Sequence, residues 1–259
     1  MNDYNREIEF AKTLALKAGE IISKNFLHST ITTKTNLTPV TETDLAVSKL
    51  VIDEVKKYFP SHAVVVEELQ QDNGHTEFQW VCDPVDGTVP FSHHIPACMF
   101  SLALCRNEEP VVAVAYDPFL KRMYFTFLNK ESYLNNKTIH VNKNKFVPGD
   151  YIFGRPYFGK DFDANKYLAL LRENKIKDST VGSLVYEGTR VAAGLSKGMI
   201  AIGCSPWDRA AIKMIIENAG GICTDERGER LPVFGSPKYF IASNGTVHKE
   251  LLDIVQKCI

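Results

Sequence analysis

The stretch WVCDPVDGT at residues 80–88 contains the strongest structural signals in the chain. Its apolar beginning is typical of a buried strand, and the proline that follows Asp83 favours an extended residue before it. Asp86 and Gly87 form a tight-turn pair, and Thr88 stands where a helix can begin. The stretch therefore predicts a strand, a turn and a helix start that hold two carboxylates close together.

The residues around this stretch predict two helices packed on a sheet. Apolar side chains recur every three or four positions over residues 4–27 and 43–59, and Pro60 ends the second helix. The polar residues 32–38 between them indicate a loop or hairpin. Short apolar runs separated by turn residues are typical of an antiparallel meander. They occur at Ala63–Val66, Phe78–Cys82, Met99–Cys105, Val111–Tyr116 and Arg122–Phe127.

The second half of the chain alternates strand-like and helix-like segments, which favours an α/β layer. We expect strands at Tyr151–Phe153, Ser179–Val181, Met199–Ile202, Ile222–Thr224 and Tyr239–Ala242. We expect helices at Asn165–Glu173, Leu184–Ser196, Trp207–Ala219 and Thr246–Lys257. The Val-Pro-Gly sequence at 147–149 marks the predicted boundary between an α+β half, residues 1–147, and an α/β half, residues 148–259.

Composition excludes several classes of protein. The 259 residues include 30 basic and 31 acidic side chains, and a net charge of −1 argues against binding to a nucleic acid polymer or an anionic membrane. No stretch approaches the roughly 20 apolar residues of a membrane span, and the charged first ten residues do not resemble an export signal. The six cysteines form no CxxC pair. We therefore expect a cytoplasmic protein with reduced cysteines.

Acidic residues gather at the ends of the predicted elements. They are Asp44, Glu67, Glu68, Asp83, Asp86 and Asp208. Carboxylates in such positions can converge on one cleft and hold a hard divalent cation. Most of them also have a simpler interpretation: Asp44, Asp86 and Asp208, like Thr88, could cap a helix, and the pair Glu67-Glu68 could be a solvated strand end. Taken singly, the residues leave these alternatives open.

Four strings in their order along the chain indicate a family. They are VTETD at 40–44, the pair Glu67-Glu68, the stretch at 80–88, and WDRAA at 207–211 followed by ENAGG at 217–221. Together they resemble the inositol monophosphatase family of magnesium-dependent, lithium-sensitive phosphatases, which are related to fructose-1,6-bisphosphatase. The resemblance covers nearly the whole chain. It implies a layered αβαβα sandwich with the active site in the cleft between the two halves.

The resemblance also implies the metal ligands and the catalytic residues. Two to three Mg2+ ions are expected on Glu67, Asp83, Asp86, Asp208 and the carbonyl of Val85. Asp44 and Thr88 match the pair that orients and deprotonates the attacking water, and Glu67 would also face a third ion.

The phosphate contacts follow from the same resemblance. The amides of Gly87 and Thr88 would bind the phosphate, with Ser183 and Lys34 as further candidates for binding the substrate.

The activity implied is the hydrolysis of a small phosphate monoester, such as inositol monophosphate or a similar polyol or sugar phosphate. Two cations can hold the attacking and leaving oxygens in line, so no covalent nucleophile is needed. Histidinol phosphate, 3′-phosphoadenosine 5′-phosphate and fructose 1,6-bisphosphate are alternative substrates within the superfamily. A catalytically silent protein that binds a phosphate ligand is the alternative of another class. A homodimer is implied by the resemblance alone.

Two positions depart from the family pattern and concern the substrate. Position 201 is Ala201 where inositol-specific members usually carry a glutamate, and Pro90 stands where asparagine is common. We expect Ala201 to weaken the recognition of a polyol. Candidate residues of the leaving-group pocket are Arg155, Tyr157, Ser183, Tyr186, Glu187 and Arg190.

Overall fold

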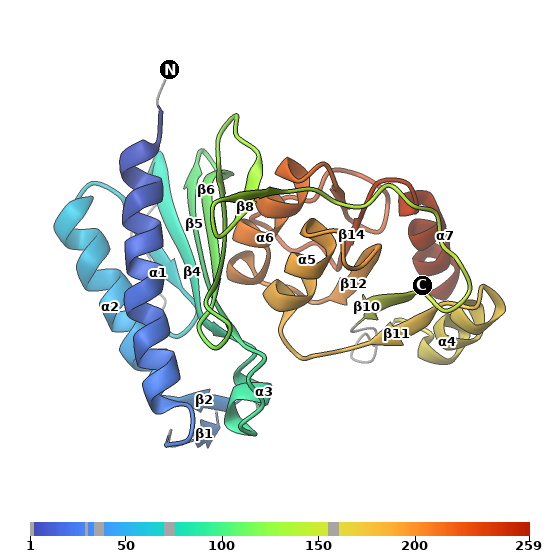
Figure 1. Cartoon of the computed structure of the whole chain (residues 1–259), viewed down its shortest axis with the longest axis horizontal. Coiled ribbons are helices and arrows are strands. Elements are labelled where there is room, and N and C mark those ends of the chain that lie inside the picture. Colours follow the sequence, from blue (N-terminus) through green and yellow to red (C-terminus); the bar gives the residue numbers. More distant parts are fainter. Residues whose placement is uncertain (1–2, 29–30, 34–38, 70–75, 155–160) are drawn as a thin grey trace.

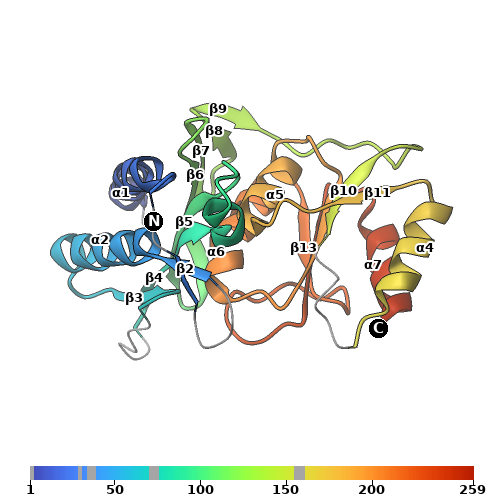
Figure 2. The same ribbon diagram turned by 90° about the horizontal axis from the view of Figure 1, so that it is seen from below.

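The computed structural model describes residues 3–28, 31–33, 39–69, 76–154 and 161–259. These residues form five layers in the order helix, sheet, helix, sheet, helix (Figure 1; Figure 2 shows the layers from below). The structure thus confirms the predicted layered αβαβα sandwich. Within the described residues, no helix combines the length and the apolar character that crossing a bilayer requires.

The first two layers come from the first half of the chain. Helices α1 (Asn5–Asn25) and α2 (Glu42–Tyr58) cover one face of a seven-stranded sheet. In spatial order the sheet contains β3 (Ala63–Val66), β4 (Phe78–Asp86), β5 (Met99–Arg106), β6 (Glu109–Asp117), β7 (Arg122–Phe127), β8 (Ser132–Leu134) and β9 (Lys137–Ile139). A hairpin of β1 (Ile31–Thr33) and β2 (Pro39–Thr41) and the short helix α3 (Thr88–Ser92) lie at one end of this sheet (Figure 1).

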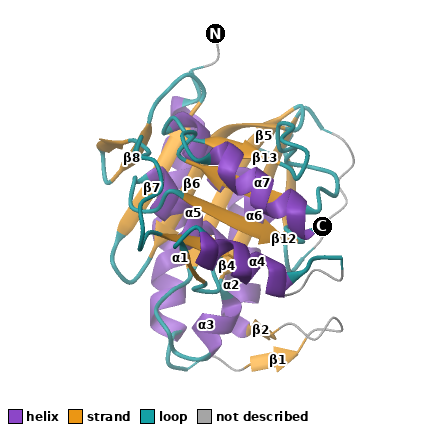
Figure 3. Cartoon of the chain, turned by 90° about the vertical axis from the view of Figure 1, so that its right-hand side faces the viewer, coloured by secondary structure: helices purple, strands orange, loops and turns teal. Residues whose placement is uncertain are grey.

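The remaining layers come from the second half. Helices α5 (Leu184–Ala192) and α6 (Pro206–Asn218) form the middle layer between the two sheets. The second sheet has the order β11 (Lys177–Ser179), β10 (Tyr151–Gly154), β12 (Gly198–Ile202), β14 (Tyr239–Ser243) and β13 (Ile222–Thr224). Helices α4 (Ala164–Glu173) and α7 (His248–Cys258) cover its outer face, in front of β12 in Figure 3.

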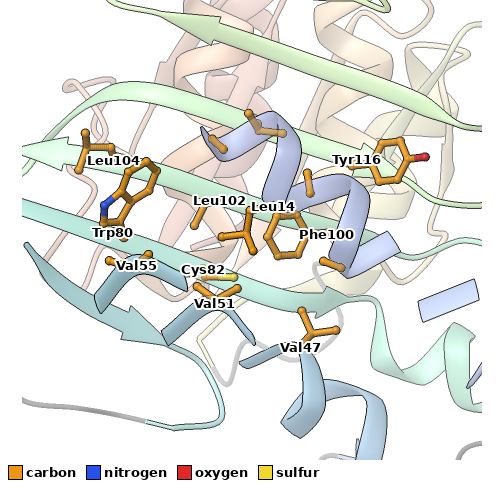
Figure 4. Close-up of a cluster of buried hydrophobic side chains, with 14 of the residues drawn as sticks. Leu14, Val47, Val51, Val55, Trp80, Cys82, Phe100, Leu102, Leu104 and Tyr116 are labelled. Carbon is orange, nitrogen blue, oxygen red and sulfur yellow. The ribbon is translucent and has the colours of Figure 1, made fainter. Parts of the chain in front are cut away.

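The alternation of side chains along β4 and β5 explains why helices pack on both faces of the first sheet. Trp80 and Cys82 point toward α1 and α2, whereas Val81 between them packs toward α6. Leu102 and Leu104 of β5 join the first cluster, which Figure 4 shows with Val51 and Val55 of α2. The second cluster combines residues of both predicted halves, so residues 1–147 and 148–259 share a core. Their division into domains stays a prediction.

Three details of the predicted elements were wrong. Strand β3 runs parallel to β4, so it is not part of an antiparallel meander; the connection over 67–77 is long enough for the chain to return in the same direction. Strand β11 lies two residues before its predicted position. Helix α5 ends at Ala192 rather than Ser196, because Gly194 adopts a left-handed conformation (φ 72°) that closes the helix.

The hairpin of β8 and β9 was missed although its sequence contains a signal. Asn135 and Asn136 form its two-residue turn, and both have positive φ angles (45° and 67°). Asparagine tolerates this conformation better than most residues, and such pairs favour tight hairpin turns.

Helices α5 and α6 approach each other closely at Gly188, where a Cβ atom would overlap the side chain of Ile212. We expect Gly188→Ala to lower the free energy of unfolding by about 1–3 kcal/mol through overpacking, whereas the same change in an exposed helix raises it by about 1 kcal/mol. Urea unfolding measures the difference. In an Ile212→Ala background the loss should shrink, and an equal loss in both backgrounds would contradict this packing.

Candidate active site

Strand β4 and the turn after it place two acidic side chains at the junction of the halves. Asp83 and Asp86 are both buried, and the pairing of β4 with β5 shifts register between them. The backbone N–H of Val85 donates a hydrogen bond to Asp83 Oδ1 (3.0 Å). Gly87 follows with φ 97°, and a Cβ atom there would lie 2.9 Å from Ser183 Cβ. Only glycine therefore fits this turn without strain.

Asp208 at the start of α6 completes a group of three carboxylates. Oxygen atoms of Asp83, Asp86 and Asp208 all lie within 4.8 Å of one another. Carboxylate oxygens are hard donors of the kind that Mg2+ binds in proteins, and three of them at this spacing can share one ion. The residues present therefore fit a divalent cation.

Glu67 joins this group from the end of β3. Its backbone N–H donates to the carbonyl of Cys82 (3.2 Å), which fixes Glu67 beside Asp83. Burial raises the pKa of Asp83 well above its ordinary value, and the charges of the four other carboxylates, Glu67, Asp86, Asp208 and Asp44, raise it further. A bound cation would relieve this repulsion.

Asp44 uses its two carboxylate oxygens differently. Its Oδ2 accepts the backbone N–H of Thr41 (2.8 Å) and closes a capping box at the start of α2. Its Oδ1 lies 3.3 Å from the hydroxyl of Thr88, which can donate to it or to the carbonyl of Val85 (3.2 Å). Burial, and then the charge of Glu67, raise the pKa of Asp44, although the hydrogen bonds from Thr41 act against this. The structure thus brings the predicted pair Asp44 and Thr88 together.

Asp208 likewise caps its helix while facing the acidic group. The backbone N–H of Ser205 donates to Asp208 Oδ2 (2.6 Å), so the capping box suggested by the sequence exists. The buried guanidinium of Arg209 donates to the carbonyls of Cys204, Val233 (2.8 Å) and Gly235 (2.8 Å). These bonds hold the loop before Asp208 in place.

Asp86 is bound by the start of α5, a contact that the sequence analysis missed. The N–H groups of Leu184 and Val185 donate to its two oxygens (3.1 and 2.9 Å), and the hydroxyl of Ser183 donates as well. Ser183 also caps α5 by accepting the N–H of Tyr186. The residue pair Gly-Ser before an apolar helix was the only local signal for this cap. Ser183 is fully buried here, beside Asp86.

Most of the other candidate residues are either outside the described part of the chain or buried within the protein. Lys34, Arg155 and Tyr157 lie outside the described residues. Glu187 and Arg190 are buried and bonded to residues of the protein itself, so neither is an open wall of a pocket. Both residues are charged and lie in a predicted helix, and nothing in the sequence indicated that they are buried and bonded within the protein.

The two departures from the family pattern are both buried. Ala201 lies in the core cluster between the second sheet and the middle helices, and its surroundings are apolar. Pro90 of α3 packs against Gly182: a Cβ atom at Gly182 would lie 3.2 Å from the proline ring.

Comparison with known proteins assigns the chain to a class and then to a family. The sequence profile described as the inositol monophosphatase family matches residues 3–259. Together with the acidic site, this match defines a phosphoric monoester hydrolase. The chain belongs to the inositol monophosphatase family.

Individual relatives agree with this assignment. The fructose-1,6-bisphosphatase/inositol-1-monophosphatase of Thermotoga maritima is 29% identical over 226 residues, 85% of this chain and 83% of that protein. The Nus factor SuhB of Escherichia coli K12 is 29% identical over 264 residues, 96% of this chain and 98% of that protein. The solved structure of a Thermotoga maritima IMPase superposes with a TM-score of 0.88 at 27% identity and covers 97% of both chains.

The repulsion around Asp83 leads to a prediction for the metal-free protein. Because the pKa of Asp83 is raised by folding, the folded state binds more protons than the unfolded state between the two pKa values. Stability in EDTA therefore falls as the pH rises above about 3.9, the unfolded value, toward the folded one. Asp83→Asn should weaken this pH dependence and raise the Tm at pH 7 by about 3 °C or more, as 1 kcal/mol does in a chain of this size.

Calorimetry with and without Mg2+ tests both parts of this prediction. Mg2+ at 100 times its Kd should stabilise the wild type by about 2.7 kcal/mol and should have little effect on Asp83→Asn. Asp225→Asn is a matched control, because Asp225 accepts backbone N–H groups in an exposed turn outside the acidic group. A lower Tm for Asp83→Asn in EDTA would contradict the repulsion.

Proposed function

We propose that this protein is a Mg2+-dependent phosphomonoesterase that hydrolyses a small polyol or sugar phosphate, such as inositol monophosphate. One observation carries the proposal: the three carboxylates Asp83, Asp86 and Asp208 converge beside the pair of Asp44 and Thr88. A cation site alone would suit a binding protein. A buried base bonded to a hydroxyl beside that site suits the activation of water.

The proposed metal ligands divide into two overlapping sets. Glu67, Asp83 and the carbonyl of Val85 would hold one ion, and Asp83, Asp86 and Asp208 would hold a second, with a third ion facing Glu67. When bound, Mg2+ supplies positive charge that offsets the negative charge of the phosphate oxygens as the ester bond breaks. The acidic side chains set where these ions lie, and their number stays a prediction.

Thr88 and Asp44 would form the path for the proton of the attacking water. The hydroxyl oxygen of Thr88 can accept a hydrogen bond from a water and can donate its own proton to Asp44 Oδ1 at 3.3 Å. As the water oxygen attacks phosphorus, the P–O bond to the substrate alcohol breaks, and the departing oxygen takes a proton from solvent. The proton of the attacking water passes to Thr88, whose own proton passes to Asp44. The pKa of Asp44 is raised toward neutral pH, which makes its carboxylate a stronger base.

The phosphate would be bound where β4 meets α3. The N–H groups of Gly87 and Thr88, one and two residues beyond Asp86, lie at this turn, and the family resemblance implies that they bind the phosphate. Ser183 and Lys34 stay predictions as substrate contacts. Lithium sensitivity, a homodimer and a cytoplasmic location also stay predictions from the resemblance and the sequence.

The apolar character around Ala201 bears on the choice of substrate. A buried alanine offers no acceptor to a substrate hydroxyl, so we expect weaker discrimination in favour of inositol than a glutamate would give. Fructose 1,6-bisphosphate is the second candidate substrate, because the Thermotoga maritima relative is named a fructose-1,6-bisphosphatase as well as an inositol-1-monophosphatase. Histidinol phosphate and 3′-phosphoadenosine 5′-phosphate complete the panel.

Phosphate release from these four substrates with Mg2+ tests the proposal. We expect at least one substrate to give a kcat/KM of about 10⁴ M−1 s−1 or more, the range of genuine enzymes. EDTA should abolish the activity. Stabilisation by Mg2+ without turnover of any of the four would favour a silent phosphate-binding protein instead.

The proton path gives a sharper prediction. Asp44→Asn keeps a side chain that can cap α2 but removes the base, so we expect kcat to fall about 10²–10⁴-fold with little change in the Mg2+-induced Tm shift. Asp163→Asn makes the same chemical change at the cap of α4 and should leave kcat unchanged. Undiminished turnover by Asp44→Asn would remove Asp44 from the proton path.

A further inference from the structure

The orientation of Asp86 depends on the start of α5, which belongs to the other half of the chain. Both carboxylate oxygens of Asp86 accept hydrogen bonds from this helix: from the N–H groups of Leu184 and Val185 and from the hydroxyl of Ser183. A displacement of the segment before α5 would therefore move Asp86 or break these bonds. Whatever fixes that segment also fixes the carboxylate.

Glu187, in the first turn of α5, holds residues 180–182 in place. Its carboxylate is 1% exposed, and Oε1 accepts the backbone N–H groups of Val181 (2.7 Å) and Gly182 (3.2 Å) and the hydroxyl of Thr180 (3.3 Å). Three donors on one oxygen tie residues 180–182 to the helix that follows them.

Residues 180–183 pack tightly against the turn at Gly87 and Thr88, where the phosphate is proposed to bind. Gly182 has φ 89°, and a Cβ atom there would lie 3.2 Å from Cδ of Pro90. A Cβ atom at Gly87 would lie 3.2 Å from Cγ of the same proline and 2.9 Å from Ser183 Cβ. Small shifts of residues 180–183 would thus be transmitted to both Asp86 and the turn at Gly87.

We propose that Glu187 is a positioning residue of the metal site, which sets Mg2+ affinity and turnover by holding residues 180–183 against Asp86. It acts through the reach of its carboxylate oxygen rather than through its charge. The inference rests on the proposed function, in which Asp86 is a metal ligand. Residues that orient metal ligands in this indirect way typically change metal affinity or activity about 10–100-fold when they are replaced.

A purely structural role is the competing explanation. Glu187 is an acidic residue in the first turn of α5, where the helix dipole favours negative charge. If that were its only contribution, its replacement would lower the Tm and leave the affinity of the folded protein for Mg2+ unchanged. The two explanations therefore differ in a quantity other than stability.

Two substitutions separate reach from charge. Glu187→Gln removes the charge but keeps a carbonyl oxygen at the same distance from the three donors. Glu187→Asp keeps the charge but shortens the side chain by one methylene, so the oxygen no longer reaches Val181 and Gly182. We expect Glu187→Asp to raise the Mg2+ concentration at half-maximal Tm shift about tenfold or more and to lower kcat similarly, and Glu187→Gln to stay near the wild type.

The measurements are the Mg2+ titration of the Tm, which needs no substrate, and phosphate release. Asp163→Ala removes the cap of α4, which lowers the Tm without touching residues 180–183, and should leave the Mg2+ midpoint unchanged. The reverse order of Gln and Asp, or a lower Tm with unchanged Mg2+ midpoints in both variants, would overturn the proposal. If the wild type binds Mg2+ but hydrolyses none of the substrates, the proposed activity fails while the Mg2+ midpoints still decide the role of Glu187.

Discussion

Repulsion among five carboxylates is the constraint on which the arrangement of this site depends. Three of them are held by backbone N–H groups at the starts of helices: Asp44 at α2, Asp86 at α5 and Asp208 at α6. The beginning of a helix has a partial positive charge, so three helices directed at one place offset part of the negative charge. The layered fold brings these helix starts together, because one of them packs on the first sheet and two lie between the sheets (Figure 1).

This arrangement also shows why capping a helix and serving a catalytic site are compatible. A carboxylate has two oxygens, and in Asp44 one caps α2 while the other faces Thr88. The hydrogen bond of the cap holds the side chain in place before any ligand arrives, so binding has less to order. Asp208 is held by Ser205 in the same way. The sequence pattern of a capping box therefore supported both interpretations, and the structure contains both geometries.

The parts of the fold and site that could be predicted are those that depend on local sequence. The stretch at 80–88 predicted the strand, turn and helix start correctly, and the spacing of Thr41 and Asp44 predicted a cap. Contacts between distant segments could not be predicted this way: the parallel pairing of β3 follows from the path of the chain, and the link from Asp86 to α5 joins residues almost a hundred positions apart. Glu187 was expected in the leaving-group pocket, and no local pattern indicated its bonds to residues 180–182.

The site is consequently a property of the packed halves rather than of either half. Asp83 and Asp86 come from β4, whereas Asp208 and the N–H groups that bind Asp86 come from helices of the second half. An apolar cluster holds those helices in place, and it includes Val81 of β4, two residues before Asp83. Side chains on one strand thus serve both purposes: the apolar ones dock the middle helices, and the acidic ones at its end meet the starts of those helices. Any change that loosens the packing of α5 or α6 on the first sheet would therefore also move the ligands apart.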